Sequence, residues 1–193
     1  MAVLRSPHAH AKIRHIDASA ALSMPGVTAI YTSADLPLGI GDRRIPLLLP
    51  NPAIVTPRTQ YPLAKDEVCY VGDPIAIVLA ENRYQAEDAL PFIEVDYEVL
   101  DAVSDVREAA CGAPLAHSDL KDNVIASFTQ MYGDVDAAFA SADHIFSESI
   151  WQHRGGGMSM ETRGVIAEVD HDTGILTVWS STQTPHLARR ILS

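Results

Sequence analysis

The stretch Pro74-Ile75-Ala76-Ile77-Val78-Leu79-Ala80 is a continuous apolar run, and it decides how the first half of the chain is interpreted. A short run without polar alternation is typical of a strand buried on both faces. After it, Tyr84 and the apolar residues of 86–90 predict one side of a helix over 83–92. Apolar and charged residues then alternate over 93–100, which predicts a further strand with one buried face. The order strand, helix, strand indicates a compact unit of mixed secondary structure.

The N-terminal residues extend this pattern. Val3–Arg5 predicts a strand fragment, and Asp17 predicts the start of a short helix. A compact apolar strand is expected over 27–31. The segment 36–62 contains six prolines, which fix backbone angles and remove hydrogen-bond donors, so we expect an irregular surface connection there. Strand structure is expected to resume at 68–71.

The second half of the chain contains its own set of expected elements. Asp134 is a suitable N-cap for a short helix, and residues 144–152 predict a strand. Alternation over 163–170 and 175–180 predicts an antiparallel hairpin. Pro185 suits the first position of a final helix.

The predicted fold class is therefore α+β. Glycine, proline, histidine and aspartate concentrate in 112–122, which we interpret as a linker between one domain at 1–115 and a second at 116–193. A helix that began at Pro185 and stopped at Ser193 would be shorter than the ~12–15 residues that are marginally stable alone. We therefore expect the chain to be a fragment of a larger protein.

The composition argues against several classes of protein. The net charge is −11, from 14 basic and 25 acidic residues, and basic residues form no run longer than a pair, so a nucleic-acid partner is not expected. No apolar run approaches the ~20 residues of a membrane span, and no secretory signal is visible, so we expect a cytoplasmic protein. The two cysteines, Cys69 and Cys111, are too few to hold an iron–sulfur cluster. Neither has a histidine beside it in the sequence, so both are interpreted as core residues.

Three short motifs could carry chemistry, and each has a plainer interpretation. His8 and His10 would share one face of a strand and could bind a metal, but no third ligand is near them, so structural or surface histidines are preferred and no metal ligand is assigned. Gly155-Gly156-Gly157 could cradle a phosphate only before a helix, whereas a strand follows it, so a flexible connection is preferred. Glu161 could be interpreted as a catalytic carboxylate. We instead expect it to form a buried ion pair with Arg163 that fixes the turn before the hairpin.

Gln183 lies in Trp179-Ser180-Ser181-Thr182-Gln183-Thr184-Pro185-His186, where a predicted strand gives way to a predicted helix. Such junctions commonly carry functional groups in proteins of mixed α and β structure. A glutamine amide offers one carbonyl and one NH2 group, so it can position a ligand but cannot transfer protons. A capping or solvated glutamine is the plainer alternative.

Seven short segments, spread over nearly the whole chain, carry a family resemblance. They are Val3-Leu4-Arg5-Ser6-Pro7-His8-Ala9-His10-Ala11, Met24-Pro25-Gly26-Val27, Val71-Gly72-Asp73-Pro74-Ile75-Ala76, Val95-Asp96-Tyr97-Glu98-Val99-Leu100, Gly133-Asp134-Val135-Asp136, Met160-Glu161-Thr162-Arg163-Gly164 and the stretch from Trp179 to His186. In the same order, they resemble segments in the large subunit of the molybdenum hydroxylases, the family of xanthine dehydrogenase, aldehyde oxidase and aerobic carbon monoxide dehydrogenase.

This resemblance implies a fold and an activity. The fold is a hammerhead-type α/β domain followed by the start of the first molybdopterin-binding domain. The activity is the oxidation of a small molecule (an aldehyde, purine, N-heterocycle or carbon monoxide) with water as the oxygen source. The implied cofactor is molybdenum-molybdopterin in the complete subunit, with FAD and iron–sulfur clusters in partner domains or subunits. The remainder of the large subunit would be a further partner.

The resemblance also implies roles for single residues. The glutamine at the position of Gln183 hydrogen-bonds an oxygen ligand of the molybdenum, so Gln183 is the expected cofactor-binding residue. The catalytic base of the family is a glutamate near the far C-terminus of the large subunit, so none of these 193 residues is expected to be catalytic. A docking or structural module without activity of its own is the alternative.

Overall fold

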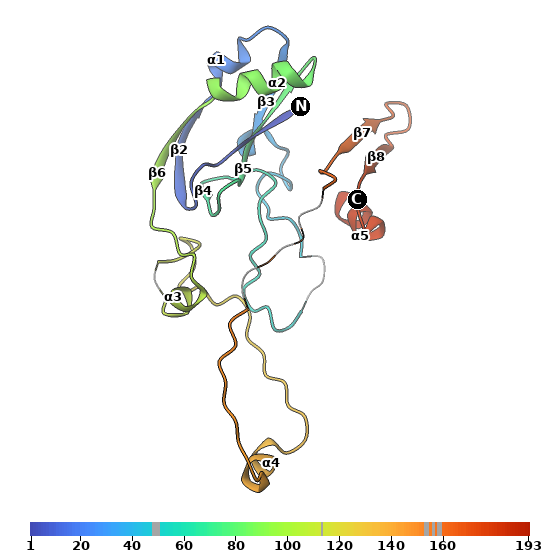
Figure 1. Ribbon diagram of the computed structural model, residues 1–193. Coiled ribbons are helices and arrows are strands. Elements are labelled where there is room, and N and C mark those ends of the chain that lie inside the picture. The colour runs from blue at the N-terminus through green and yellow to red at the C-terminus, as the bar shows by residue number, and fades with distance from the viewer. Residues whose placement is uncertain (48–50, 113, 153–154, 156, 158–159) are drawn as a thin grey trace. The chain divides into compact units, whose positions relative to one another are not determined.

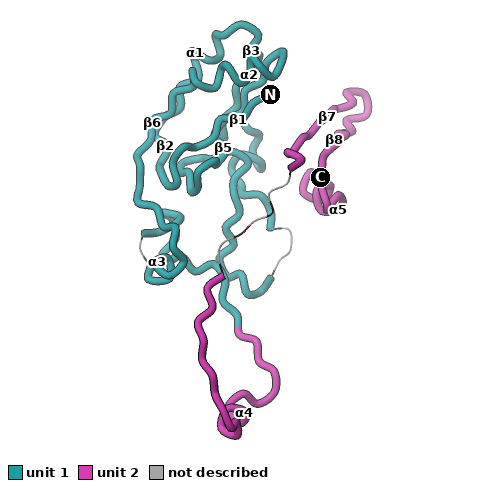
Figure 2. Tube along the Cα trace, in the orientation of Figure 1, with its two compact units in different colours: residues 1–128 teal, residues 129–193 magenta. Residues whose placement is uncertain are grey.

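The computed structural model describes residues 1–47, 51–112, 114–152, 155, 157 and 160–193, which form two compact units, 1–128 and 129–193 (Figures 1 and 2). Unit 1 contains β1 (Ala2–Arg5), β2 (Ala11–Asp17), α1 (Ser19–Leu22), β3 (Val27–Thr32), the 3-10 helix η1 (Ser33–Asp35), β4 (Glu67–Val68), β5 (Pro74–Ala80), α2 (Arg83–Ala89), the 3-10 helix η2 (Leu90–Phe92), β6 (Glu94–Val99) and α3 (Val106–Ala110). Unit 2 contains α4 (Val135–Ser141), β7 (Val165–Val169), β8 (Leu176–Ser180) and α5 (Pro185–Leu192).

Strand β5 is the middle strand of the first sheet, whose order is β1-β5-β3 with both pairings antiparallel. Its bounds are those of the apolar run from Pro74 to Ala80. Ile75, Ala76 and Val78 are fully buried. Adjacent positions such as Ile75 and Ala76 point to opposite faces, so both faces of the strand are covered. This double burial explains why the strand shows no polar alternation.

Strand β2 is the middle strand of the second sheet, whose order is β4-β2-β6, again antiparallel. The sequence did not predict it. Lys12, Arg14 and His15 are hydrophilic, and the register against β6 shifts between Ile13 and His15. Such an irregularity changes which face later side chains occupy, so the simple period on which strand prediction relies is lost.

Small residues let helices α1 and α2 lie close to the first sheet. Ala21 of α1 and Ala86 and Ala89 of α2 pack in one buried cluster with Val78 of β5. A second buried cluster joins the two sheets and consists of Ala11, Ala64, Val68 and Ile75. This second cluster positions β4, the short edge strand from which the site described below is built.

Several predicted elements of unit 1 are confirmed. The helix expected over 83–92 is α2 continued by η2, and the strands expected over 27–31 and 93–100 are β3 and β6. The side chain of Asn82 caps α2 by accepting a hydrogen bond from the Gln85 amide at 3.1 Å. The strand expected at 68–71 is shorter, because the chain turns at Gly72, where φ is +92° and the amide donates to the Ser6 carbonyl at 2.8 Å.

The segment 112–122 lies inside unit 1, where hydrogen bonds hold its described residues in place. Asn123 holds it in place: its Oδ1 accepts from the Ala116 amide at 2.8 Å, and its Nδ2 donates to the carbonyls of Ala109 and Pro114. The described residues of this segment are therefore ordered by hydrogen bonds, and their interpretation as a linker between two domains stays a prediction. Helix α3, which the sequence did not predict, precedes the segment and is capped by Asp105. The domain boundary at 115/116 stays a prediction.

Unit 2 contains the predicted hairpin and both predicted helices. Asp134 caps α4 by accepting from the Ala137 amide at 2.9 Å. Strands β7 and β8 pair antiparallel, and Gly174 closes their turn with a φ of +69°. The strand expected over 144–152 is absent from these described residues. No strand in the part of the chain that the structure describes pairs with them, and an extended segment without hydrogen-bonded partners is not a strand.

Within the described residues, no helix combines the length and apolar character needed to cross a lipid bilayer.

Candidate functional site

Gln183 lies in the connection between β8 and α5 and is exposed. The residues around it are connected by hydrogen bonds. The Ser181 hydroxyl donates to Glu161 Oε1 at 3.1 Å, and the Thr184 amide donates to Thr182 Oγ1 at 3.1 Å. The Gln183 amide itself makes no hydrogen bond to any residue that the structure describes. Its donor and acceptor are therefore available to a ligand, and its role in cofactor binding stays a prediction.

The expected ion pair between Glu161 and Arg163 is not formed. Both residues are exposed, and Glu161 instead accepts a hydrogen bond from Ser181 of the β8–α5 connection. The two residues lie before β7 in irregular backbone, where the spacing of two does not place their side chains on one face. Of the triple-glycine motif, Gly156 lies outside the described residues, and no role is assigned to its neighbours.

An apolar groove of about 800 Å³ lies within unit 2, between the hairpin and α5. Its apolar lining includes Val165, Leu176, Val178 and Leu192. Outside the groove, Trp179 of β8 is 53% exposed. This half of the chain therefore presents apolar side chains that a folded neighbour could cover.

His8 and His10 do not share a strand face, so that prediction is wrong. Both lie in the connection between β1 and β2. His8 packs edge-on against Tyr97 with 4.8 Å between ring centroids. His10 is only 5% exposed and bridges two elements: Nδ1 lies 2.9 Å from the Asp101 carbonyl, and Nε2 lies 2.6 Å from Glu67 Oε1.

The partners of His10 define its protonation. A carbonyl oxygen only accepts, so Nδ1 must carry a proton. Burial raises the pKa of Glu67, but hydrogen bonds from Ser118 and His10 outweigh this effect and bring the pKa below its ordinary value. Glu67 is thus an ionised acceptor, and the His10 ring and this carboxylate form a short, largely buried hydrogen bond.

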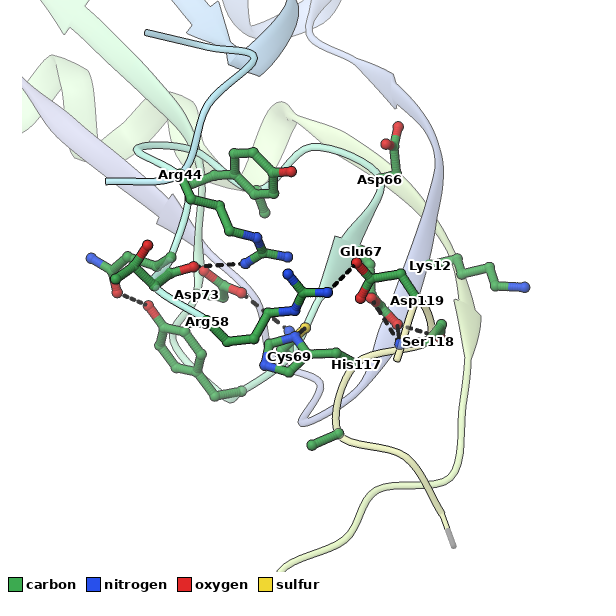
Figure 3. A pocket seen from close by; sticks show the side chains of 16 residues that line it. Lys12, Arg44, Arg58, Asp66, Glu67, Cys69, Asp73, His117, Ser118 and Asp119 are labelled. Atoms are coloured by element: carbon green, nitrogen blue, oxygen red, sulfur yellow. Dashed lines mark hydrogen bonds and ion pairs between the residues drawn. The ribbon is translucent and has the colours of Figure 1, made fainter. Parts of the chain in front are cut away.

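Glu67 also holds a distant segment of unit 1. Its carboxylate accepts from the Ser118 hydroxyl and from the Ser118 amide, the latter at 3.1 Å to Oε1. These contacts bring residues 116–119 against β4 (Figure 3). Because Glu67 begins the edge strand of the second sheet, one carboxylate connects β4, His10 and the segment after α3.

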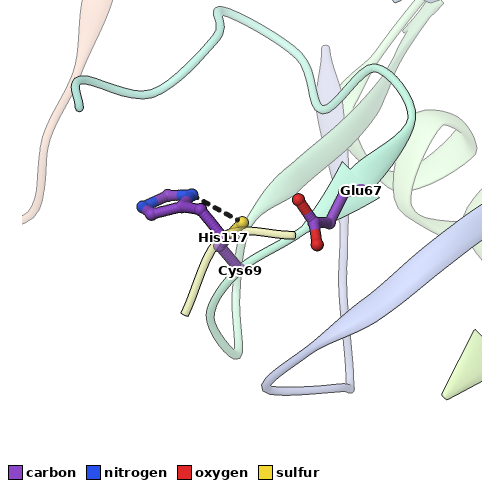
Figure 4. A group of neighbouring side chains, drawn as sticks. All are labelled: Glu67, Cys69 and His117. Carbon is purple, nitrogen blue, oxygen red and sulfur yellow. Dashed lines mark hydrogen bonds between the residues drawn. The ribbon is translucent and has the colours of Figure 1, made fainter. Parts of the chain in front are cut away.

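Cys69 and His117 meet beside this carboxylate. The Cys69 Sγ lies 3.2 Å from His117 Nδ1 (Figure 4). Burial and the charges of Glu67 and Asp73 raise the pKa of Cys69 to about 12. Burial and the charge of Arg44 lower the pKa of His117. A neutral thiol therefore donates to a neutral imidazole, so Cys69 is no ready nucleophile.

The expectation that both cysteines are core residues is wrong for Cys111, which is exposed at the C-terminal end of α3. It also missed the histidine next to Cys69, because His117 is 48 residues away in the sequence. The only local signal was the spacing of Glu67 and Cys69, which places both side chains on one side of an extended segment.

A cavity of about 460 Å³ opens beside this cluster, entirely within unit 1 (Figure 3). Two arginines line it. Arg58 donates to Asp119 Oδ2 at 2.7 Å, and Arg44 donates to the Thr59 carbonyl at 2.6 Å while its guanidinium lies 4.5 Å from the centre of the Tyr61 ring. Each guanidinium group thus donates to a neighbouring side chain or to the backbone, while the buried Nε of Arg58 has no hydrogen-bond partner among the described residues.

The chain matches two known protein families, one in each half. Residues 1–101 match the family described as "Aldehyde oxidase and xanthine dehydrogenase, a/b hammerhead domain", and residues 116–193 match "Molybdopterin cofactor-binding domain". The chain is 39% identical over 190 residues to the nicotine 6-hydroxylase large subunit of Paenarthrobacter nicotinovorans, covering 98% of this chain and 23% of that protein. It is 35% identical over 204 residues to the carbon monoxide dehydrogenase large chain of Afipia carboxidovorans, covering 98% of this chain and 24% of that protein.

Solved structures are similar over the same length. Quinoline 2-oxidoreductase from Pseudomonas putida 86 superposes with a TM-score of 0.85 at 31% identity, covering 99% of this chain and 24% of that one. A Cu,Mo-containing carbon monoxide dehydrogenase superposes with a TM-score of 0.82 at 33% identity, covering 100% of this chain and 25% of that one. The chain therefore spans about a quarter of the length of the relatives it matches.

Proposed function

Because the chain belongs to the aldehyde oxidase and xanthine dehydrogenase family, in which residues 1–101 form the hammerhead domain, we propose that it is part of the large subunit of a molybdenum-dependent hydroxylase. The whole protein would oxidise a small molecule, with water as the source of the incorporated oxygen. The observation that carries this proposal is the order of the two family matches, hammerhead then molybdopterin-binding, along one chain.

One observation supports the proposal that Gln183 binds the cofactor. Gln183 presents an amide without a hydrogen-bond partner among the described residues, in the connection between β8 and α5 of the segment that matches the molybdopterin-binding family. The molybdenum cofactor, when bound, supplies the redox chemistry by accepting two electrons from the substrate. Gln183 would bind it by donating from its NH2 group, and neighbouring hydrogen bonds such as that from Ser181 to Glu161 would hold this connection in place.

The electrons must leave through other carriers. Cys69 and Cys111 are the only cysteines, too few to hold an iron–sulfur cluster. We therefore propose that iron–sulfur clusters and FAD are carried by other domains or subunits of the assembly. The relatives described as large subunits or large chains support an assembly of this kind.

The substrate is proposed only as a class. Among the similar proteins, one is named for nicotine, one for quinoline and others for carbon monoxide. Their common feature is a small molecule, so we propose a small oxidisable substrate and assign no individual compound.

The test is purification of the native protein that contains this chain, with molybdenum, iron and flavin quantified in the same preparation. We expect about one molybdenum per chain and the reduction of an artificial electron acceptor when a panel of N-heterocycles, aldehydes and carbon monoxide is offered. Absence of molybdenum from protein purified in its native assembly would refute the proposal.

A further inference from the structure

Three side chains of different chemistry converge in unit 1 at a place that the proposed function does not use. Glu67 in β4 and Cys69 just after it are two residues apart on an extended segment, so they face the same side. His117 arrives from the segment that follows α3. One donor atom from each residue lies within 4.8 Å of the donor atoms of the other two (Figure 4).

We infer that Glu67, Cys69 and His117 bind a divalent transition-metal ion of the zinc type. A thiolate, an imidazole and a carboxylate are the three ligand types that Zn²⁺ takes from proteins. Hard cations such as Mg²⁺ and Ca²⁺ prefer all-oxygen sites, so the sulfur and nitrogen donors select against them. The two anionic donors, thiolate and carboxylate, together offset the charge of the ion.

The spacing of the donors is close to what the ion needs. The Cys69 Sγ and His117 Nδ1 are now 3.2 Å apart, at hydrogen-bond distance. Around a tetrahedral ion with bonds of about 2.3 Å to sulfur and 2.0–2.1 Å to nitrogen, the same two atoms would be about 3.5 Å apart. An ion can therefore replace the shared proton with a separation of a few tenths of an ångström, while the carboxylate moves inward. The thiol proton passes to solvent in this exchange.

The surrounding residues hold the ligands in position. His10 and Ser118 fix the carboxylate of Glu67 through Oε1, whereas Oε2 lies at a longer 3.4 Å from the Ser118 amide. The Cys69 amide donates to Asp73 Oδ2 at 3.1 Å, which fixes the backbone that carries the thiol. Such supporting hydrogen bonds are what orients ligands in metal sites.

The cavity supplies the remaining coordination position. It has a volume of about 460 Å³ and is lined by all three ligands, so a water molecule or a small anion could complete the coordination. The two arginines that line the cavity, Arg44 and Arg58, have other partners, because Arg58 is paired with Asp119 and Arg44 donates to a carbonyl. All three ligands belong to unit 1, so this inference does not depend on the activity proposed above.

The first test uses Co²⁺ as a spectroscopic probe on the complete chain. We expect one bound Co²⁺ with thiolate-to-cobalt charge-transfer absorption, and competition by Zn²⁺ should remove this band. Cys69→Ser should abolish the band, and His117→Gln should weaken binding more than tenfold. Cys111→Ser and His171→Gln are the matched controls, since both positions are exposed and outside the cluster, and they should leave binding unchanged.

A second test needs no substitution and therefore does not depend on whether a variant folds. The wild-type chain is treated with a thiol-alkylating reagent with and without Zn²⁺, and the modified cysteine is identified by mass spectrometry. Zn²⁺ should slow alkylation of Cys69 at least tenfold, while the exposed Cys111 reacts equally in both samples. Equal reactivity of Cys69 with and without Zn²⁺, or a cobalt band that survives Cys69→Ser, would overturn the inference.

Discussion

The contact between His10 and Glu67 helps to hold three segments of unit 1 together. Both ring nitrogens of His10 are used, one on the Asp101 carbonyl and one on the Glu67 carboxylate. Removal of either side chain would leave a largely buried polar group without this partner, which typically costs about 1–3 kcal/mol. The pair therefore holds the connection after β1, the edge strand β4 and the end of β6 in one arrangement.

Gln183 is the residue on which the proposed activity can be tested most directly. In the native assembly, Gln183→Ala should lower kcat by about 10–100-fold, the range typical for loss of a residue that supports a metal centre. Molybdenum content should be retained, because a single donor is lost and the rest of the cofactor contacts remain. Both quantities are measured on the same preparation.

The control for this variant is Gln130→Ala. Gln130 is also an exposed glutamine of unit 2 that makes no hydrogen bond among the described residues. Its replacement should leave kcat unchanged. A Gln183→Ala enzyme with the turnover of the wild type would remove Gln183 from the cofactor site, while the family assignment would stand.

At the scale of single elements, helix α2 depends on its first turn. Asn82 has extended backbone angles, its Oδ1 accepts from the Gln85 amide, and its Nδ2 donates to Gln85 Oε1 at 2.8 Å. Without the cap, an amide at the helix start would lose its partner. The helix matters to the whole unit because Ala86 and Ala89 belong to the buried cluster around β5.

We expect Asn82→Ala to lower the free energy of unfolding of unit 1 by about 1 kcal/mol, the usual cost of losing an N-cap side chain. Urea unfolding followed by circular dichroism measures this difference. Asn82→Asp keeps an acceptor at the cap and should cost much less. If the two variants were equally destabilised, the loss would have to come from contacts other than the cap.

Strand β4 is an element that no local pattern could have bounded. Only Glu67 and Val68 pair with β2, opposite Lys12 and Ala11. Val68 is fully buried and anchors the strand in the second cluster, and Glu67 and Cys69 then face the cavity. A two-residue strand of this kind exists because its neighbours position it, since two residues carry no period of their own.

The two units differ in how far they bury apolar surface. The buried hydrophobic residues among those described all lie between Ala2 and Ile93, in unit 1. In unit 2, by contrast, large apolar side chains such as Phe146 at 91% and Ile150 at 88% remain exposed. The hydrophobic effect therefore stabilises unit 1 far more than unit 2.

This difference predicts uneven protection from hydrogen exchange in the chain on its own. Amides of β5 should exchange only through global unfolding, because the strand is hydrogen-bonded on both edges and buried. Amides of β7 and β8 should exchange at least a hundredfold faster. Mass spectrometry after timed deuterium labelling compares the two segments.

Concentration provides the control for this measurement. If the exposed apolar side chains of unit 2 associate between copies of the chain, protection of the hairpin will rise with concentration, whereas an isolated chain gives the same rates at all dilutions. Protection of β7 and β8 equal to that of β5 at the lowest concentration would contradict the expected difference.

The sequence by itself determined the elements with a clear local signal. The apolar run of β5, the spacing of α2, the alternation of the β7–β8 hairpin and Pro185 at the start of α5 each lie within a few neighbouring residues. Ordered family segments along the chain also predicted the hammerhead and molybdopterin-binding matches. Such features are readable because hydrogen-bond geometry and side-chain period act over short distances along the chain.

Only the tertiary structure decided the rest. Strand β2 forms because β4 and β6 lie on its two edges, and the segment 144–152 is not a strand because no partner lies beside it among the described residues. Likewise, His117 reaches Cys69 across 48 residues, and His10 reaches Glu67 across 57. These contacts depend on how the sheets and connections pack together. The local sequence around either partner therefore does not predict them.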